Sequence, residues 1–286
     1  LETCRCMLGA AIDTVYLKVD EFGKIDIREL EKHLEEPTLL VSVMMANNEI
    51  GTTQDIKRIA TVAHEKGALF HTDAAQSVGK IPVDVREMGV DYLTMSGHKV
   101  YGPKGIGALY VKKEAPFCPL IHGGHQESGR RAGTENTLGI IGFGKAIEMR
   151  GIEMEEEAER LLDLKKVLKD GLENNIPDIK FIGHPTDSLP GTLNVSFSGV
   201  EGEAIMLHLD LEGIAVSTGS ACSSGSLGPS HVILATGVSE EFANGSIRIS
   251  MGRETTMEDV ERTVDSFGRV IPRLRKISSR YLAREI

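Results

Sequence analysis

The sequence predicts an α/β protein: a mostly parallel sheet covered by helices, followed by a smaller C-terminal α+β domain. Short apolar runs alternate with helix-periodic segments through the first half of the 286 residues. Beyond about residue 150 the predicted strands become shorter and long acidic helical stretches appear. We therefore expect a large domain over residues 1–150 and a small domain, which carries a Gly/Ser-rich cysteine loop, over residues 151–286.

The first half supplies the strand–helix alternation. Residues 26–35 have helical periodicity, and the continuous apolar run Leu39–Ala46 predicts a strand buried on both faces. Asp55 is a plausible cap for a helix that ends at Gly67. Further strands are predicted over residues 68–72, 90–95 and 107–112. In such sheets, ligands bind beyond the carboxyl ends of the strands.

The second half has a different pattern. A helix is expected over residues 134–150, followed by an acidic helical stretch over residues 154–172. Gly and Ser dominate the stretch Ser217–Ser230. The remaining elements are predicted strands at 192–197, 214–217 and 246–251, and predicted helices at 202–211 and 257–278.

Composition and charge argue against several classes of partner. The sequence has 32 Lys and Arg against 42 Asp and Glu, and this net charge of −10 disfavours nucleic acid or an anionic membrane. No apolar run approaches the roughly 18 residues of a membrane span. The four cysteines are interpreted as reduced thiols of a cytoplasmic protein. We expect no metal site, although His122 and His125 leave a small metal pair as the alternative to a Gly-rich turn.

The first ten residues, LETCRCMLGA, have no initiator Met and no capping signal before an apparent helix. This pattern is typical of a chain that starts inside an element. We therefore expect a further segment upstream, with N-terminal processing as the alternative.

Polar side chains follow three of the predicted strands. They supply an amide, a carboxylate, a hydroxyl, an imidazole and an amine, and each alone is compatible with ordinary turn chemistry. Together they suit pyridoxal phosphate, which needs a lysine, an acid beside its ring nitrogen and donors for its phosphate. The residues at these strand ends are Asn48, Asp73, Gln76, Ser96, His98 and Lys99.

Two residues of the second half have unusual surroundings. Arg248 lies within the apolar segment Ser-Ile-Arg-Ile-Ser, where a guanidinium is costly unless an acid or a ligand meets it. Its planar fork suits a carboxylate, but structural pairing is equally compatible with this position. Cys222 lies in a Gly- and Ser-rich stretch that cannot pack as core, which favours a reactive thiol.

Six motifs, in this order along the chain, carry a family resemblance: ANNEIG, HTDAAQSVGK, SGHKVYGPKGIG, GRRAGT, STGSACSSGSLGPSH and SIRISMGR. Together they resemble the cysteine desulfurases of the NifS/IscS type, which are class V, fold-type I pyridoxal phosphate enzymes. The resemblance runs almost from end to end. By this resemblance, Lys99 corresponds to the Schiff-base lysine, Asp73 to the partner of the ring nitrogen and Gln76 to the partner of the ring hydroxyl. Asn48 corresponds to an asparagine near both cofactor and substrate.

The resemblance also implies roles for residues that bind phosphate and substrate. Ser96 and His98 correspond to phosphate ligands, and Thr134 to a threonine that reaches the phosphate in the other subunit of a homodimer. Arg248 corresponds to the arginine that binds the substrate carboxylate. Cys222 corresponds to the nucleophile that takes up sulfur as a persulfide.

The resemblance implies that the chain converts L-cysteine to L-alanine and passes the sulfur to an acceptor protein such as an iron–sulfur scaffold. Two alternatives stay open: another class V enzyme, such as a selenocysteine lyase or an aminotransferase, and a truncated, non-catalytic form that dimerises or carries sulfur. The family also has an upstream turn that cradles the phosphate and a histidine that stacks on the ring. None of the 286 residues matches either feature.

Overall fold

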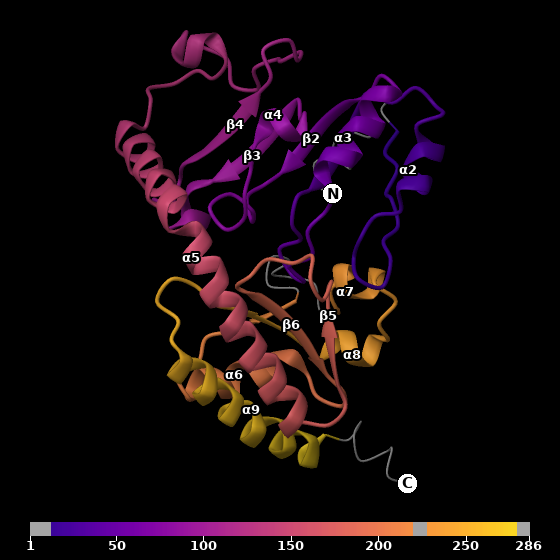
Figure 1. The fold of residues 1–286 in the computed structure, drawn as a ribbon, viewed down its shortest axis with the longest axis vertical. Coiled ribbons are helices and arrows are strands. Elements are labelled where there is room, and N and C mark those ends of the chain that lie inside the picture. The colour runs from indigo at the N-terminus through magenta and orange to yellow at the C-terminus, as the bar shows by residue number, and fades with distance from the viewer. Residues whose placement is uncertain (1–12, 220–227, 279–286) are drawn as a thin grey trace.

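The computed structural model describes residues 13–219 and 228–278, and it has the predicted α/β architecture. Two four-stranded sheets lie at opposite ends of the long axis of the molecule, and one long helix, α5 (Thr137–Asn175), runs past both (Figure 1). The two sheets differ in strand direction, as the change in sequence pattern at mid-chain predicts.

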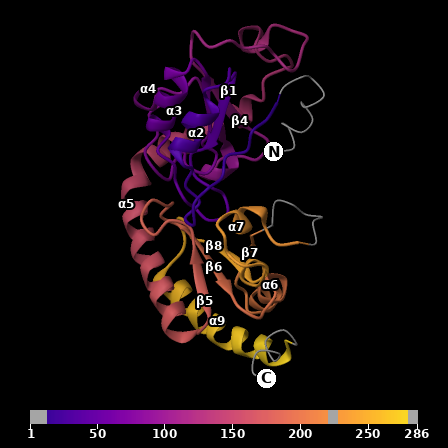
Figure 2. The same cartoon turned by 90° about the vertical axis from the view of Figure 1, so that its right-hand side faces the viewer.

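The first sheet has the strand order β1-β2-β3-β4, with β1, β2 and β3 parallel and β4 antiparallel to β3. Figure 2 shows the helices α2, α3 and α4 together at this end of the molecule. The strands are β1 (Leu40–Met44), β2 (Leu69–Asp73), β3 (Tyr92–Ser96) and β4 (Gly107–Val111). The helices are α2 (Ile27–His33), α3 (Ile56–Glu65) and α4 (Val85–Met88), with 3-10 turns η2 (Gly97–Val100) and η3 (Gln126–Gly129).

The prediction that Leu39–Ala46 is buried on both faces is wrong for the described residues. Val41 is 7% exposed, but its neighbours Leu39 and Leu40 are 69% and 44% exposed. The reason is that the core of this sheet forms on one face only, where Val41 and Phe70 pack with residues of α2 and α3 such as Leu30 and Ile59. In β1 the exposed Leu40 and Ser42 therefore flank the buried Val41.

The second sheet is antiparallel with the order β5-β6-β8-β7. Its core lies between the strands and α5, α6 and α9, and Phe197 stacks on Phe267 at a ring distance of 5.2 Å. The strands are β5 (Ile179–Ile182), β6 (Thr192–Phe197), β7 (Ser217–Thr218) and β8 (Ser246–Ser250). The helices are α6 (Gly202–Leu211), α7 (His231–Ala235), α8 (Glu240–Asn244) and α9 (Met257–Ile277).

The helix α5 is continuous over 39 residues, whereas the sequence predicts two separate helices. Gly151 lies inside it, at a cost of about 1 kcal/mol relative to alanine. Packing offsets this cost, because Phe143 contacts the core around Val100 and Leu168 belongs to the core of the second sheet. Residue 151 thus falls within a helix that both sheets share. We propose that the two domains correspond to the two sheets, with α5 common to both.

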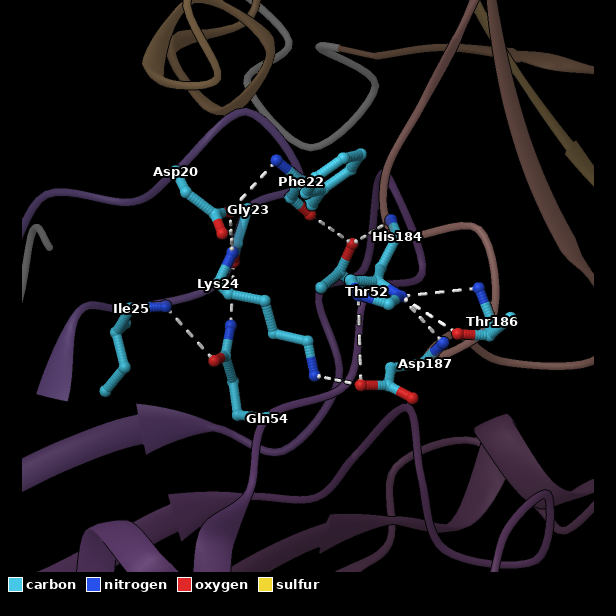
Figure 3. A network of polar contacts seen from close by, with 10 residues as sticks. All are labelled: Asp20, Phe22, Gly23, Lys24, Ile25, Thr52, Gln54, His184, Thr186 and Asp187. Atoms are coloured by element: carbon cyan, nitrogen blue, oxygen red, sulfur yellow. Dashed lines mark hydrogen bonds and ion pairs between the residues drawn. The ribbon is translucent and has the colours of Figure 1, made fainter.

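A polar network also links loops of the first half of the chain to the loop that follows β5 (Figure 3). The Thr52 hydroxyl donates to the Phe22 carbonyl oxygen at 2.7 Å and accepts from the His184 main-chain N–H at 2.9 Å. Lys24 forms an ion pair with Asp187 at 2.9 Å. Thr52 is completely buried, and its two part-buried hydrogen bonds link the turn before α2 to the loop after β5.

Helices α5 and α9 are long enough to cross a membrane, but no helix in the described part of the chain combines that length with sufficient apolar character. Among the same residues, no three His, Cys, Asp or Glu side chains are grouped as metal ligands.

Candidate active site

A cavity of about 270 Å³ lies at the junction of the two sheets. The loop after β1, the turns after β2 and β3, the middle of α5 and the strand β8 all contribute to its wall. Four residues predicted from the sequence are among them. The polar lining residues are Asn48, Gln76, Lys80, Lys99, Tyr101, Arg150, Glu157, Thr192, Arg248 and Ser250.

Lys99 is positioned by the 3-10 turn η2, which follows β3 directly. Gly97 begins this turn in close contact with a neighbouring segment: a Cβ there would lie 2.7 Å from the Ile106 side chain and 3.1 Å from the Pro103 carbonyl oxygen. Any larger residue at this position must shift the backbone. The segment SGHK therefore docks tightly on GPKGI, and the turn directs Lys99 to the cavity wall.

Arg248 reaches the same cavity from β8. Its Nη1 donates to the Asn48 carbonyl oxygen at 2.9 Å, and its Nη2 donates to the Ser217 hydroxyl at 3.3 Å. Nε is buried and has no hydrogen-bond partner among the described residues. A buried guanidinium with an unsatisfied N–H is costly, so this geometry favours an anionic ligand beside Arg248. No carboxylate of the described residues forms an ion pair with it, although its charge acts on the buried Glu49.

Asn48 and Gln76 complete the part of the lining that the sequence predicts. The preceding Asn47 folds the loop after β1, because its Oδ1 accepts from the main-chain N–H groups of Glu49 and Ile50 at 2.8 and 3.0 Å. This Asx turn holds Asn48 at the junction of the two sheets. Gln76 lies in the turn after β2, where its Oε1 accepts from Lys80 Nζ at 3.2 Å.

Asp73, Ser96 and His98 stand at the predicted strand ends but are not lining residues of the cavity. Asp73 ends β2, and its Oδ1 accepts from the Ala75 main-chain N–H at 2.9 Å. Ser96 ends the adjacent strand, and its Oγ lies 3.0 Å from His98 Nδ1. The strand register pairs Asp73 with Thr94, so the three side chains belong to neighbouring strand ends of the same sheet edge.

The remaining two predicted residues lie apart from this cavity. Thr134 is exposed in the loop before α5, and its side chain makes no hydrogen bond with the described residues. Cys222 lies outside the described residues. On either side of that gap, Gly219 and Ser230 both lie against the buried Glu49, whose Oε2 accepts from the Ser230 hydroxyl at 2.5 Å. Burial raises the pKa of Glu49, against the opposing effects of Ser230 and Arg248.

Lys80, Tyr101 and an ion pair in the cavity wall are not predicted from the sequence. Arg150 and Glu157, both on α5, pair at 2.7 Å, and Arg150 lies 5.5 Å from the centre of the Tyr101 ring. Lys80 follows Gln76 by four residues after a predicted strand, a position that any turn lysine can occupy. The Arg150–Glu157 spacing of seven residues is one that any long helix can contain.

The comparisons with known proteins identify the family. The model of class-V aminotransferases matches residues 6–263. The chain belongs to this family. A cysteine desulfurase IscS from Dictyoglomus turgidum is 51% identical over 97% of this chain, and the match covers 71% of that relative. The chain therefore spans about seven-tenths of the length of that relative, and the family resemblance stated from the six motifs is confirmed.

Solved structures agree with this class-V assignment. A NifS-like protein from Rickettsia africae has a TM-score of 0.86 and 32% identity, with 94% of this chain and 73% of that chain covered. A structure titled "SspA in complex with cysteine" has a TM-score of 0.74 and 37% identity, with 87% and 69% covered. The predicted fold class, a fold-type I large domain with a smaller α+β part, is confirmed.

The class-V family implies pyridoxal phosphate, and its amine and cationic partners lie in the cavity, while Asp73, Ser96 and His98 lie at the neighbouring strand ends. Burial and the charges of Lys99, Arg248 and Arg150 lower the pKa of Lys80 to about 8, and Glu157 opposes this shift. Excess positive charge and the unpartnered Arg248 Nε both favour an anionic ligand. Lys99 supplies the amine that an aldehyde requires. The residues that surround the cavity therefore fit the cofactor.

Proposed function

We propose that the chain takes sulfur from L-cysteine, releases L-alanine and leaves the sulfur as a persulfide on Cys222. The carrying observation is that Lys99 and Arg248, from opposite sheets, line one cavity. Homology supports the same activity, because the class-V relative at 51% identity is a cysteine desulfurase. The structure with cysteine bound, at 37% identity, supports L-cysteine as the substrate.

Arg248 binds the carboxylate of the substrate in this proposal. Its guanidinium is oriented by Asn48 and Ser217, and its Nε still lacks a partner among the described residues. A carboxylate accepts charge-assisted hydrogen bonds from such a group, each stronger than a bond between neutral partners. The carboxylate of the amino acid is therefore held at Arg248, in the cavity that Lys99 also lines.

Lys99 acts as the amine of the site and moves the proton of the substrate Cα. Pyridoxal phosphate, when bound, links to a lysine amine and withdraws electrons from the substrate Cα. Asp73, at the end of β2, would serve as the acid beside the ring nitrogen, and Gln76 and Asn48 would bind the ring side of the cofactor. Ser96 and His98 would hold its phosphate, and Thr134 would reach the phosphate bound to a second subunit.

Cys222 is the acceptor of sulfur. Its thiolate attacks the substrate sulfur, an S–S bond forms as the C–S bond breaks, and the carbon keeps the electron pair. A proton then converts that carbon to the methyl group of L-alanine. The persulfide passes to an acceptor protein such as an iron–sulfur scaffold. A Gly- and Ser-rich segment suits this task, since the thiol must serve two partners.

We also propose that the chain forms a homodimer and that it is located in the cytoplasm. Exposed apolar side chains near the start of α5, Leu138 at 84% and Ile141 at 70% exposure, lie close in sequence to Thr134 and supply apolar surface for a second subunit. The reduced state expected for the thiols supports a cytoplasmic location.

The decisive experiment combines a visible absorption scan with product analysis. Purified chain mixed with pyridoxal phosphate should gain a protein-bound visible band, and added L-cysteine should yield L-alanine and sulfur in equal amounts. Transfer of the amino group to a 2-oxo acid, without release of sulfur, would instead identify an aminotransferase. The absence of both the bound band and L-alanine would favour a non-catalytic form.

A further inference from the structure

Lys80 is a second lysine of the cavity, and the proposed reaction does not use it. It follows Gly79, whose φ of +73° lies in the left-handed region that favours glycine. A Cβ on Gly79 would lie 3.1 Å from both Arg150 and Val100, so the end of this turn is held close to α5 and η2. The position of Lys80 is therefore fixed by its backbone.

The contact of Lys80 is with Gln76. Lys80 Nζ donates to Gln76 Oε1 at 3.2 Å. An ammonium group has three donors and no acceptor, so the oxygen of the amide must face Lys80. The nitrogen Nε2 then points elsewhere, and no hydrogen bond to it is found within residues 13–219 and 228–278. Because Gln76 lines the cavity, its two N–H donors are available to a molecule bound there.

The charges around Lys80 change its pKa and so affect its hydrogen bond to Gln76. Burial, followed by Lys99, Arg248 and Arg150, lowers the pKa of Lys80 to about 8, and Glu157 acts in the opposite direction. The ammonium form is still the main form at pH 7. Above about pH 8 the neutral amine can also accept a hydrogen bond, and the amide of Gln76 is then free to turn over.

We propose that Lys80 is a positioning residue that fixes the amide of Gln76, so that its N–H donors face the ring oxygen of a bound pyridoxal group. This inference rests on the proposed function. It assigns to Lys80 an effect on the cofactor that passes through a neighbouring side chain. Lys80 need not touch the cofactor or the substrate.

The first test needs no cofactor. The side-chain N–H₂ signals of Gln76 are followed by nitrogen-15 NMR from pH 6.5 to 9.5 in the full chain, with Gln76→Asn used for assignment. We expect the Gln76 signals to shift with a midpoint near pH 8, and this midpoint to be absent in Lys80→Met. An unchanged titration in Lys80→Met would overturn the proposal.

The second test is a double-mutant cycle on the affinity for pyridoxal phosphate, measured by absorbance titration at pH 7. Lys80→Met should weaken binding about tenfold, Lys80→Arg should retain most of the affinity, and the exposed Lys32→Met is the matched control. In a Gln76→Ala background, Lys80→Met should change binding by less than twofold. A tenfold loss in both backgrounds would show direct action of Lys80 and would overturn the proposal. If the unaltered chain binds no pyridoxal phosphate, the proposed function fails, and the NMR experiment alone decides the role of Lys80.

Discussion

Arg248 Nη1 donates a hydrogen bond to the carbonyl oxygen of Asn48 across 2.9 Å, although the two residues are 200 positions apart in the chain. Asn48 belongs to the loop after β1 and Arg248 to β8, so the contact joins the two sheets. The orientation of the proposed substrate-binding cation thus depends on a main-chain atom of the other half of the molecule.

Arg248→Lys should lower kcat/KM for L-cysteine by about 100-fold. The lysine retains one charge but loses the planar fork, and each charge-assisted hydrogen bond contributes about 1.5–3 kcal/mol. L-alanine release at varied L-cysteine concentration measures the effect. The control is Arg253→Lys, whose side chain is 43% exposed and pairs with Glu153. Equal losses in both variants would contradict the carboxylate role of Arg248.

Lys99→Ala should abolish the covalent link to pyridoxal phosphate and with it the release of L-alanine. We expect the free energy of unfolding to change by less than about 1 kcal/mol, since Lys99 lines a cavity and does not fill a core. Borohydride reduction followed by peptide mass analysis locates the linked lysine. The exposed Lys104→Ala is the control. A cofactor adduct on any lysine of the Lys99→Ala variant would place the link elsewhere.

Cys222→Ser should stop persulfide formation while L-cysteine still binds, because a hydroxyl is a far weaker nucleophile toward sulfur than a thiolate. Labelling with a thiol-reactive reagent after addition of L-cysteine, followed by mass analysis, detects the persulfide. Cys118→Ser is the matched control, since Cys118 is a free, exposed cysteine. A persulfide on Cys118 in the unaltered chain would contradict the assignment of Cys222 as the sulfur acceptor.

Thr52→Val should lower the free energy of unfolding by about 2–4 kcal/mol. The variant leaves two main-chain groups at a part-buried position, the Phe22 carbonyl and the His184 N–H, without their Thr52 partner. Urea unfolding followed by far-ultraviolet circular dichroism measures this loss. Thr38→Val is the control, because the Thr38 hydroxyl bonds a carbonyl oxygen at an exposed site. Similar urea midpoints for the two variants would mean that the two hydrogen bonds of Thr52 add little stability.

The stability of the chain should rise between pH 8 and pH 10.5 through Lys165. Burial lowers the pKa of Lys165 to about 8 from the ordinary 10.5. In this interval the unfolded chain holds a proton that the folded chain has released, so the free energy of unfolding increases with pH. Lys165→Met should remove on the order of 2 kcal/mol of that increase.

Lys166→Met, an exposed neighbour on α5, is the control for Lys165. Urea unfolding at pH 8 and pH 10 gives the increase for each variant. The same increase in Lys165→Met and in the unaltered chain would show that Lys165 does not titrate in this range.

The sequence predicts much of the fold because long periodic segments and strong caps dominate it. The helix predicted over residues 202–211 is observed with these bounds, and Asp55 caps α3 by accepting from Arg58 N–H at 3.1 Å. The short elements α4, α7, α8 and β5 were missed. Segments of four or five residues are too short to show a period, and tertiary contacts decide their structure.

Part of the site is also predictable from the local sequence around each residue. Lys99 and Arg248 were found because each is unusual in its local setting, a lysine in a glycine-rich turn and an arginine in an apolar strand. Their meeting in one cavity is implied only by the family resemblance, since the residues themselves do not show how the two sheets are placed. Lys80 looks like an ordinary turn lysine until that placement brings Arg248 and Arg150 near it.

The helix α5 has a thermodynamic consequence for the whole molecule. Near its start Phe143 belongs to the cluster around Val100, and near its end Leu172 belongs to the core of the second sheet. The Val100 cluster is joined to the core of the first sheet through Val78 and Met95, which pack against both. If either sheet unfolds, one part of α5 therefore loses its packing while the other part is still ordered. Because helix formation is cooperative along its length, the helix transmits the loss of one core to the other. The two sheets should therefore unfold as one cooperative unit, with a calorimetric enthalpy equal to the van't Hoff enthalpy, despite their separate cores.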